Sequence, residues 1–109
     1  MKLVKSIVRP DKVDDVREAL EKLKIGGMTV TDVRGHGRQK GHTAVYRGKE
    51  YSVTLLPKVE IEVVVPDTVV DEVIQAVTLA ARTGEIGDGR VFVIPVEHSY
   101  NIRTGEKDM

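Results

Sequence analysis

The spacing of apolar and polar residues changes several times along this chain of 109 residues, and each change marks an expected element. Over residues 59–65, valine and isoleucine alternate with charged residues, which is the period-2 pattern of a half-buried strand. Over 13–23 and 69–80, apolar residues recur every three or four positions, as in helices with one buried face. Short β-branched runs predict three further strands, over residues 4–8, 28–33 and 90–96.

Turn signals flank these elements. Pro10-Asp11 follows the first strand, and Pro66-Asp67 follows the third. We expect Asp11 to cap the first helix, Asp67 to repeat that role, and Gly26-Gly27 to end the first helix.

The two halves of the chain resemble each other, since Pro10-Asp11 aligns with Pro66-Asp67 at an offset of 56 (66 − 10). Two strand–helix–strand units give a βαββαβ order and an α+β, ferredoxin-like fold. The expected sheet is four-stranded and antiparallel, with both helices on one face. Met28, Val30 and the apolar side of the fourth strand would then lie on the uncovered face, so we expect a homo-oligomer.

Residues 35–55 show no sustained period and are rich in glycine and charge, which predicts one long loop. Between Arg34 and Lys49 there are three arginines and two lysines but no acid. Such a stretch is either a solvated hairpin tip or a segment that meets a phosphate or an acidic partner.

Composition narrows the class of protein. The length fits a single domain over residues 1–109, and the absence of cysteine excludes thiolate chemistry. The formal net charge is zero, and no apolar run is long enough to span a membrane. We therefore expect a cytoplasmic protein that neither binds nucleic acid directly nor inserts into a membrane.

A glycine-rich turn, residues 83–90, leads into the last strand and carries Gly84, Gly87 and Gly89 with Asp88 and Arg90. Such glycines let backbone N–H groups approach an anion, and the arginine adds a charged donor. The alternative is an ordinary helix-to-strand loop. A second glycine-rich basic segment, over residues 35–41, favours phosphate binding.

Other chemistry has weaker support. His36, His42 and His98 lack a compact metal-ligand spacing, so structural or exposed roles fit them better. A small ferredoxin-like phosphate or acyl-phosphate hydrolase is an alternative of a different class. The sequence offers it neither a recognisable acid/base pair nor an activated nucleophile. A nucleic-acid binder would lack the interleaved aromatic residues of stacking platforms.

Five segments together resemble the PII nitrogen-regulatory signal-transduction proteins, and the likeness extends over essentially the whole chain. These segments are residues 35–41, 46–51, 56–59, 83–92 and 102–106. The resemblance implies a homotrimer with a protruding T-loop (37–55), a phosphate-binding loop (82–90) and a C-terminal loop (98–109). It also implies a sensor, not an enzyme, that regulates protein targets through its T-loop, such as an ammonium channel or a nitrogen-metabolism enzyme.

The ligands implied by the resemblance are ATP or ADP, Mg²⁺ and 2-oxoglutarate, bound in clefts between subunits. The implied nucleotide-binding residues are Ile7, Thr29, Gly35, Gly37, Arg38, Gln39, Glu62, Val64, Gly87, Asp88, Gly89, Arg90 and Arg103. Gln39 would also offer oxygen to Mg²⁺. The implied 2-oxoglutarate-binding residues are Gln39, Lys40, Gly41 and Lys58. A PII-like trimer that serves another transporter or enzyme, with altered ligands, remains an alternative.

Three positions in the T-loop and tail bear on nucleotide preference and on covalent modification. Asn101 stands where the family usually has a second phosphate-binding arginine, so we expect a lower ATP/ADP affinity ratio than an Asn101→Arg variant would have. Lys49 replaces a small residue and excludes serine phosphorylation there. Tyr51 matches the family's nucleotidylation site, so modification of Tyr51 is a possibility that the resemblance raises.

Overall fold

The computed structural model describes residues 1–36, 43–46, 49–52 and 55–108, with only the backbone described over 43–46 and 49–52. Six strands and two α-helices follow one another, with a single 3₁₀ turn before each helix. In chain order they are β1 (Lys2–Val8), a 3₁₀ turn (Pro10–Lys12), α1 (Val13–Lys22), β2 (Thr29–Gly35), β3 (Thr43–Tyr46), β4 (Lys49–Ser52), β5 (Leu56–Val65), a second 3₁₀ turn (Asp67–Val69), α2 (Val70–Ala81) and β6 (Gly89–Pro95).

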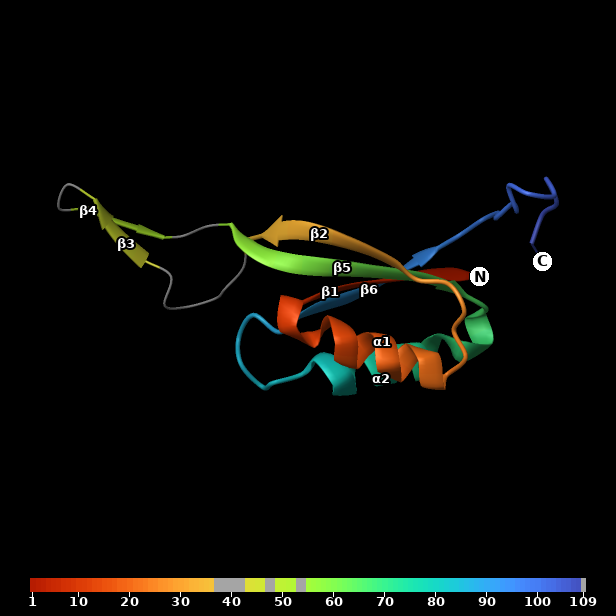
Figure 1. Ribbon diagram of the computed structural model, residues 1–109, viewed down its shortest axis with the longest axis horizontal. Helices are drawn as coiled ribbons and strands as arrows, with labels where there is room; N and C mark the ends of the chain where they lie inside the picture. Colours follow the sequence, from red (N-terminus) through yellow and green to blue (C-terminus); the bar gives the residue numbers. More distant parts are fainter. Residues whose placement is uncertain (37–42, 47–48, 53–54, 109) are drawn as a thin grey trace.

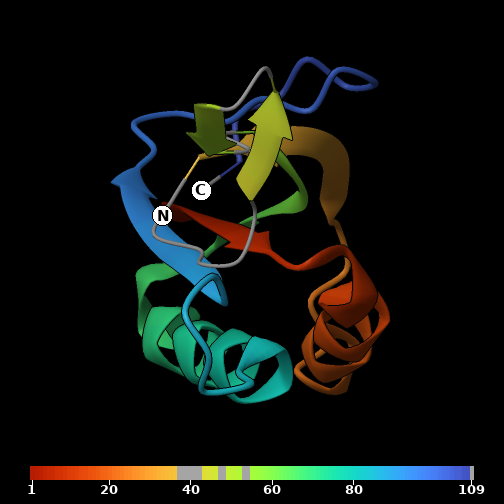
Figure 2. The same ribbon diagram turned by 90° about the vertical axis from the view of Figure 1, so that its left-hand side faces the viewer.

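The main sheet has the strand order β2-β5-β1-β6, and every neighbouring pair is antiparallel. Both helices lie on one face of this sheet and pack beside each other (Figure 1; Figure 2). The ferredoxin-like βαββαβ prediction is therefore confirmed. The first half of the chain supplies β1 and β2, and the second half supplies β5 and β6. The two halves interleave, so that β5 lies between β2 and β1, and β1 lies between β5 and β6.

A core of aliphatic side chains joins the sheet to the helices. The apolar positions of β5 that were predicted to face inward are all buried, with Ile61 only 1% exposed. Val16 and Leu20 from α1 and Val73 and Val77 from α2 meet them. The inward-facing side chains of the strand thus pack directly against the apolar faces of the two helices.

The two halves do repeat, but the offset of 56 is wrong by one residue. The helices begin at Val13 and Val70 and the strands end at Val8 and Val65, an offset of 57 in both cases (70 − 13 and 65 − 8). At this offset the buried positions of β1 coincide with buried positions of β5. The two prolines are not equivalent positions: Pro10 is the first residue of its 3₁₀ turn, whereas Pro66 precedes the turn that begins at Asp67. An alignment on the prolines is therefore one residue out of register.

The predicted caps also differ from the structure. Neither Asp11 nor Asp67 makes a side-chain cap; Asp11 lies inside the first 3₁₀ turn, and Asp67 binds the N-terminal amine at 2.6 Å. The first helix ends at Lys22, before Gly26-Gly27. Lys24 adopts a left-handed conformation (φ 60°) just past the helix end, a position that glycine usually fills.

The single long loop predicted over residues 35–55 is wrong in part, because β3 and β4 pair there as an antiparallel hairpin. This hairpin forms a separate sheet beyond the ends of β2 and β5 (Figure 1). Each strand has four residues, which is too short to show a period in the sequence.

The sheet face opposite the helices carries exposed apolar side chains. Leu3 lies opposite both Val64 and Ile94 in the register, and Phe92 is on the same face. Val64, Phe92 and Ile94 are 49%, 44% and 39% exposed. The placement of Met28 and Val30 on this face is wrong: Met28 packs against the core, and Val30 lies opposite buried Ile61 at the sheet edge. We call the surface formed by Leu3, Val64, Phe92 and Ile94 the open apolar face.

Candidate functional site

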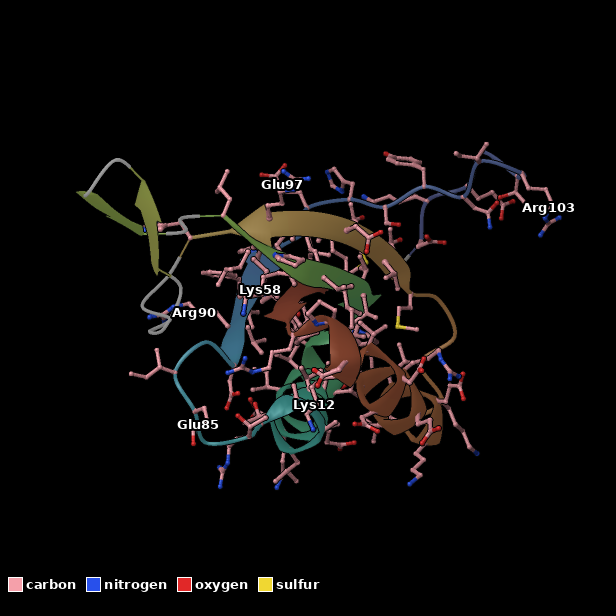
Figure 3. The ribbon with its side chains drawn as sticks, turned by 60° about the vertical axis from the view of Figure 1, so that its left-hand side comes forward. Lys12, Lys58, Glu85, Arg90, Glu97 and Arg103 are labelled. Atoms are coloured by element: carbon pink, nitrogen blue, oxygen red, sulfur yellow. The ribbon has the colours of Figure 1, made fainter. Side chains whose placement is uncertain are left out.

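The glycine-rich turn forms the connection between α2 and β6 and lies at one end of the main sheet. Gly89, the first residue of β6, pairs with Val8 at the end of β1, and Val8 also pairs with Val59 of β5. Lys58 and Arg90 lie at this same end of the molecule (Figure 3). The topology therefore gathers three separate chain segments around the turn.

The backbone of the turn depends on glycine. Gly84, Gly87 and Gly89 all have positive φ, at 93°, 101° and 115°. A Cβ on Gly89 would lie 1.8 Å from the carbonyl oxygen of Ile7. The absence of a side chain at Gly89 thus permits β1 and the turn to approach each other directly.

Asp88 organises the turn from inside. Its carboxylate accepts hydrogen bonds from the backbone N–H groups of Thr83 and Gly84, both at 2.8 Å, and from the Thr83 hydroxyl. Arg9 donates from Nε at 3.1 Å. These donors, with the Thr83 hydroxyl the largest contributor, hold the pKa of Asp88 well below its usual range. Because both carboxylate oxygens are engaged within the chain, this aspartate builds the loop.

We expect the Asp88 contacts to make stability depend on pH. Because the pKa of Asp88 is depressed in the folded state, its stabilisation is complete above the unfolded value near 4 and is lost as pH falls below it. Urea unfolding between about pH 6 and pH 3 should show a smaller loss for Asp88→Asn than for the wild type. Asp11→Asn, an exposed control, should retain the wild-type slope; equal slopes for wild type and Asp88→Asn would contradict this role.

Two further cations hold the turn by its carbonyl groups. Arg9 donates to the Ile86 carbonyl at 3.0 Å, and Lys58 donates from Nζ to the Gly87 carbonyl at 2.7 Å. Burial, assisted by the nearby Arg9 cation, lowers the pKa of Lys58, while Asp88 opposes the shift. The hydrogen bond to Gly87 joins Lys58 directly to the turn that also carries Gly89.

Arg90 differs from these cations because it is exposed and has no ion pair among the described side chains, residues 1–36 and 55–108. It is the second residue of β6 and lies opposite Ile7 in the register. A hollow of about 300 Å³ borders Arg90, Gly89 and Ile7. A second hollow, of about 350 Å³, borders Lys58, Asp32 and Arg34.

The structure brings some of the predicted site residues together and separates others. Those that meet at the turn are Ile7, Gly35, Lys58, Gly87, Asp88, Gly89 and Arg90, with Gly35 placed beside the Lys58 stem. Thr29 and Glu62 pair with each other farther along the sheet. Val64 lies six residues from Lys58 on β5 (64 − 58), which corresponds to roughly 20 Å. Arg103 lies at the opposite end of the molecule from Arg90 (Figure 3).

Several predicted residues fall outside the described part of the chain. They are Gly37, Arg38, Gln39, Lys40 and Gly41. For Lys49 and Tyr51 only the backbone, within β4, is described.

Sequence reasoning missed Arg9 and Thr83 as builders of the site. Arg9 follows the first strand directly, but its contact with Asp88 spans 79 positions and depends on the sheet topology. Thr83 gave a local signal, since a hydroxyl residue near an Asp-Gly turn commonly bonds to nearby backbone and carboxylate groups.

No group of three or more His, Asp or Glu side chains among the described residues is arranged to hold a metal ion. None of the helices that the structure describes has the length and apolar character needed to cross a membrane.

The chain matches the family Nitrogen regulatory protein P-II over residues 1–106. The Nitrogen regulatory protein P-II of Haemophilus influenzae is 56% identical over 108 residues, which is 99% of this chain and 96% of the relative. Nitrogen regulatory protein P-II 1 of Escherichia coli K12 is also 56% identical, and the protein of Rhizobium etli is 53% identical, with the same coverage.

The chain therefore belongs to the P-II family of nitrogen regulatory proteins. Because its relatives are named as regulatory proteins, the family supports a nitrogen-regulatory signalling role rather than an enzymatic one. The resemblance noted from the sequence is confirmed at the level of family, and protein partners follow from that regulatory role.

Proposed function

We propose that this protein senses the adenylate state and 2-oxoglutarate, and that it reports through residues 37–55 to nitrogen-metabolism proteins in the cytoplasm. The observation that carries the proposal is the turn of Gly87 and Gly89 beside the exposed Arg90. Positive-φ glycines leave backbone N–H groups accessible, and an unpaired guanidinium supplies two parallel donors for phosphate oxygens. ATP and ADP are the polyphosphates that we assign to this turn.

The separation of the predicted residues supports a site shared between copies of the chain. Arg90 and Arg103 lie at opposite ends of one chain, and Val64 lies roughly 20 Å along the strand from Lys58. One nucleotide can touch both groups only when a second copy supplies one of them. A homotrimer in which the open apolar face is buried satisfies both requirements, because a closed ring repeats the same contact.

For 2-oxoglutarate, the predicted cation in the described part of the chain is Lys58, whose amine already contacts the Gly87 carbonyl. One cation is insufficient for a dicarboxylate, so we propose that Mg²⁺ bridges 2-oxoglutarate and the nucleotide phosphates, with Gln39 as an oxygen ligand. Lys40 and Gly41 would complete this site. Binding of 2-oxoglutarate would thus require MgATP.

Calorimetric titration tests the nucleotide site. Wild-type protein should bind ATP and ADP competitively, and Arg90→Ala should weaken both by about tenfold or more because it removes a charged phosphate partner. Arg17→Ala is the matched control, since Arg17 pairs with Glu21 on the outer side of α1 and should leave affinity unchanged. Unchanged affinity in Arg90→Ala would assign the turn a purely structural role.

A further inference from the structure

The tail beyond β6 folds into a small hairpin of its own. Tyr100 and Lys107 form a β-bridge, and Ser99 holds Asp108 through two contacts, backbone to backbone at 2.7 Å and Oγ to Oδ2 at 2.9 Å. The tail extends away from the end of β6, and Arg103 lies near its far end (Figure 1; Figure 3). A defined structure therefore carries Arg103, although the residues around it are exposed.

Asn101 builds the tip of this hairpin. Its side-chain oxygen accepts hydrogen bonds from the backbone N–H groups of Arg103 at 2.9 Å and Thr104 at 3.2 Å. Its backbone closes the same turn, since its N–H donates to Glu106 at 2.8 Å and its carbonyl accepts from Gly105 at 2.7 Å. Asparagine is suited to this double role because its short side chain reaches the amides two and three positions ahead.

We infer that Asn101 is a positioning residue for the nucleotide site: it orders the turn that presents Arg103 to the phosphates. This inference rests on the proposed function above. An arginine at position 101 would add a cation but has no acceptor for the two amides. Compared with an arginine at position 101, asparagine gives up a cation for the phosphates but holds Arg103 in a fixed turn. A preorganised Arg103 loses less entropy on binding.

The experiment compares Asn101→Ala with Asn101→Ser, because serine keeps a neutral oxygen acceptor that can serve as a cap and alanine does not. In the nucleotide-free protein, the Arg103 and Thr104 amides should exchange about tenfold faster in Asn101→Ala, and serine should restore much of the protection. ATP affinity measured by calorimetry should fall by roughly three- to tenfold in Asn101→Ala and recover in Asn101→Ser.

A double-variant cycle separates positioning from a general structural effect. Because Asn101 acts through Arg103, Asn101→Ala should change ATP affinity by less than about twofold when Arg103 is already alanine. Additive losses, or unchanged amide exchange in Asn101→Ala, would overturn the inference. If the wild type bound no ATP, the proposed function would fail and the positioning role with it, while the exchange data would still report whether Asn101 orders the turn.

Discussion

Replacement of Gly89 by alanine is expected to destabilise the fold by at least about 3 kcal/mol. The new Cβ would lie 1.8 Å from the Ile7 carbonyl oxygen, and Gly89 already has a φ of 115°. The backbone of β1 cannot move away without losing its pairing with β6, since Val8 is the register partner of Gly89. Urea unfolding would measure the loss, and nucleotide affinity should fall with it.

Gly84→Ala is the matched control. Gly84 also has a positive φ, 93°, but no described residue apart from its own chain neighbours comes within 4 Å of the position that its Cβ would occupy. Only the left-handed conformation opposes the change, which costs about 1–2 kcal/mol. Equal losses in the two variants would show that backbone strain, and not the close approach of β1, makes glycine necessary at position 89.

Replacement of Lys58 by alanine is expected to abolish the binding of 2-oxoglutarate in the presence of MgATP. Lys58 is the cation that we assign to the dicarboxylate, and removal of such a charged partner costs about 1.5–3 kcal/mol. ADP affinity should remain nearly intact, because Arg9 still holds the turn through Asp88 and the Ile86 carbonyl when the Lys58 contact with Gly87 is lost. Gln39→Ala should give the same pattern.

Two observations would contradict this assignment. Tight binding of 2-oxoglutarate to nucleotide-free wild type would exclude the metal bridge. Full retention of 2-oxoglutarate binding in Lys58→Ala would place the dicarboxylate elsewhere. Lys22→Ala, at the end of α1, is the control for loss of a lysine remote from the turn.

Much of the fold could be predicted from local patterns. The alternation over residues 59–65 predicted the buried face of β5 correctly. The helical spacing identified the buried valines of α2 but missed Ala81, which is buried in place of Ala80. These patterns are readable because burial of one face imposes the period of the element on the sequence. The four residues of β3 are too few to show such a period. The end of α1 was misplaced because Lys24, and not a glycine, adopts the left-handed conformation there.

The glycines in the sequence indicated where the candidate site lies, but they did not predict the side-chain contacts that form it. The resemblance assigned Asp88 to the nucleotide site, and the structure adds a role that the sequence did not reveal: its carboxylate is engaged by Thr83, Gly84 and Arg9. The contact with Arg9 follows from the sheet order, which places the end of β1 beside the start of β6. Likewise, the sequence showed at Asn101 only the loss of an arginine that the family usually has. The hydrogen bonds from the Arg103 and Thr104 amides to its side chain depend on the folded tail.

We propose that two copies of the chain complete each nucleotide site. Co-expressed Arg90→Ala and Arg103→Ala chains with different tags can be purified as mixed oligomers by selection for both tags. In a cyclic trimer, about one site in three then combines an intact Arg90 from one chain with an intact Arg103 from its neighbour. We predict wild-type ATP affinity at that fraction of sites, measured by calorimetry; mixed oligomers in which no site regains wild-type affinity would contradict a shared site.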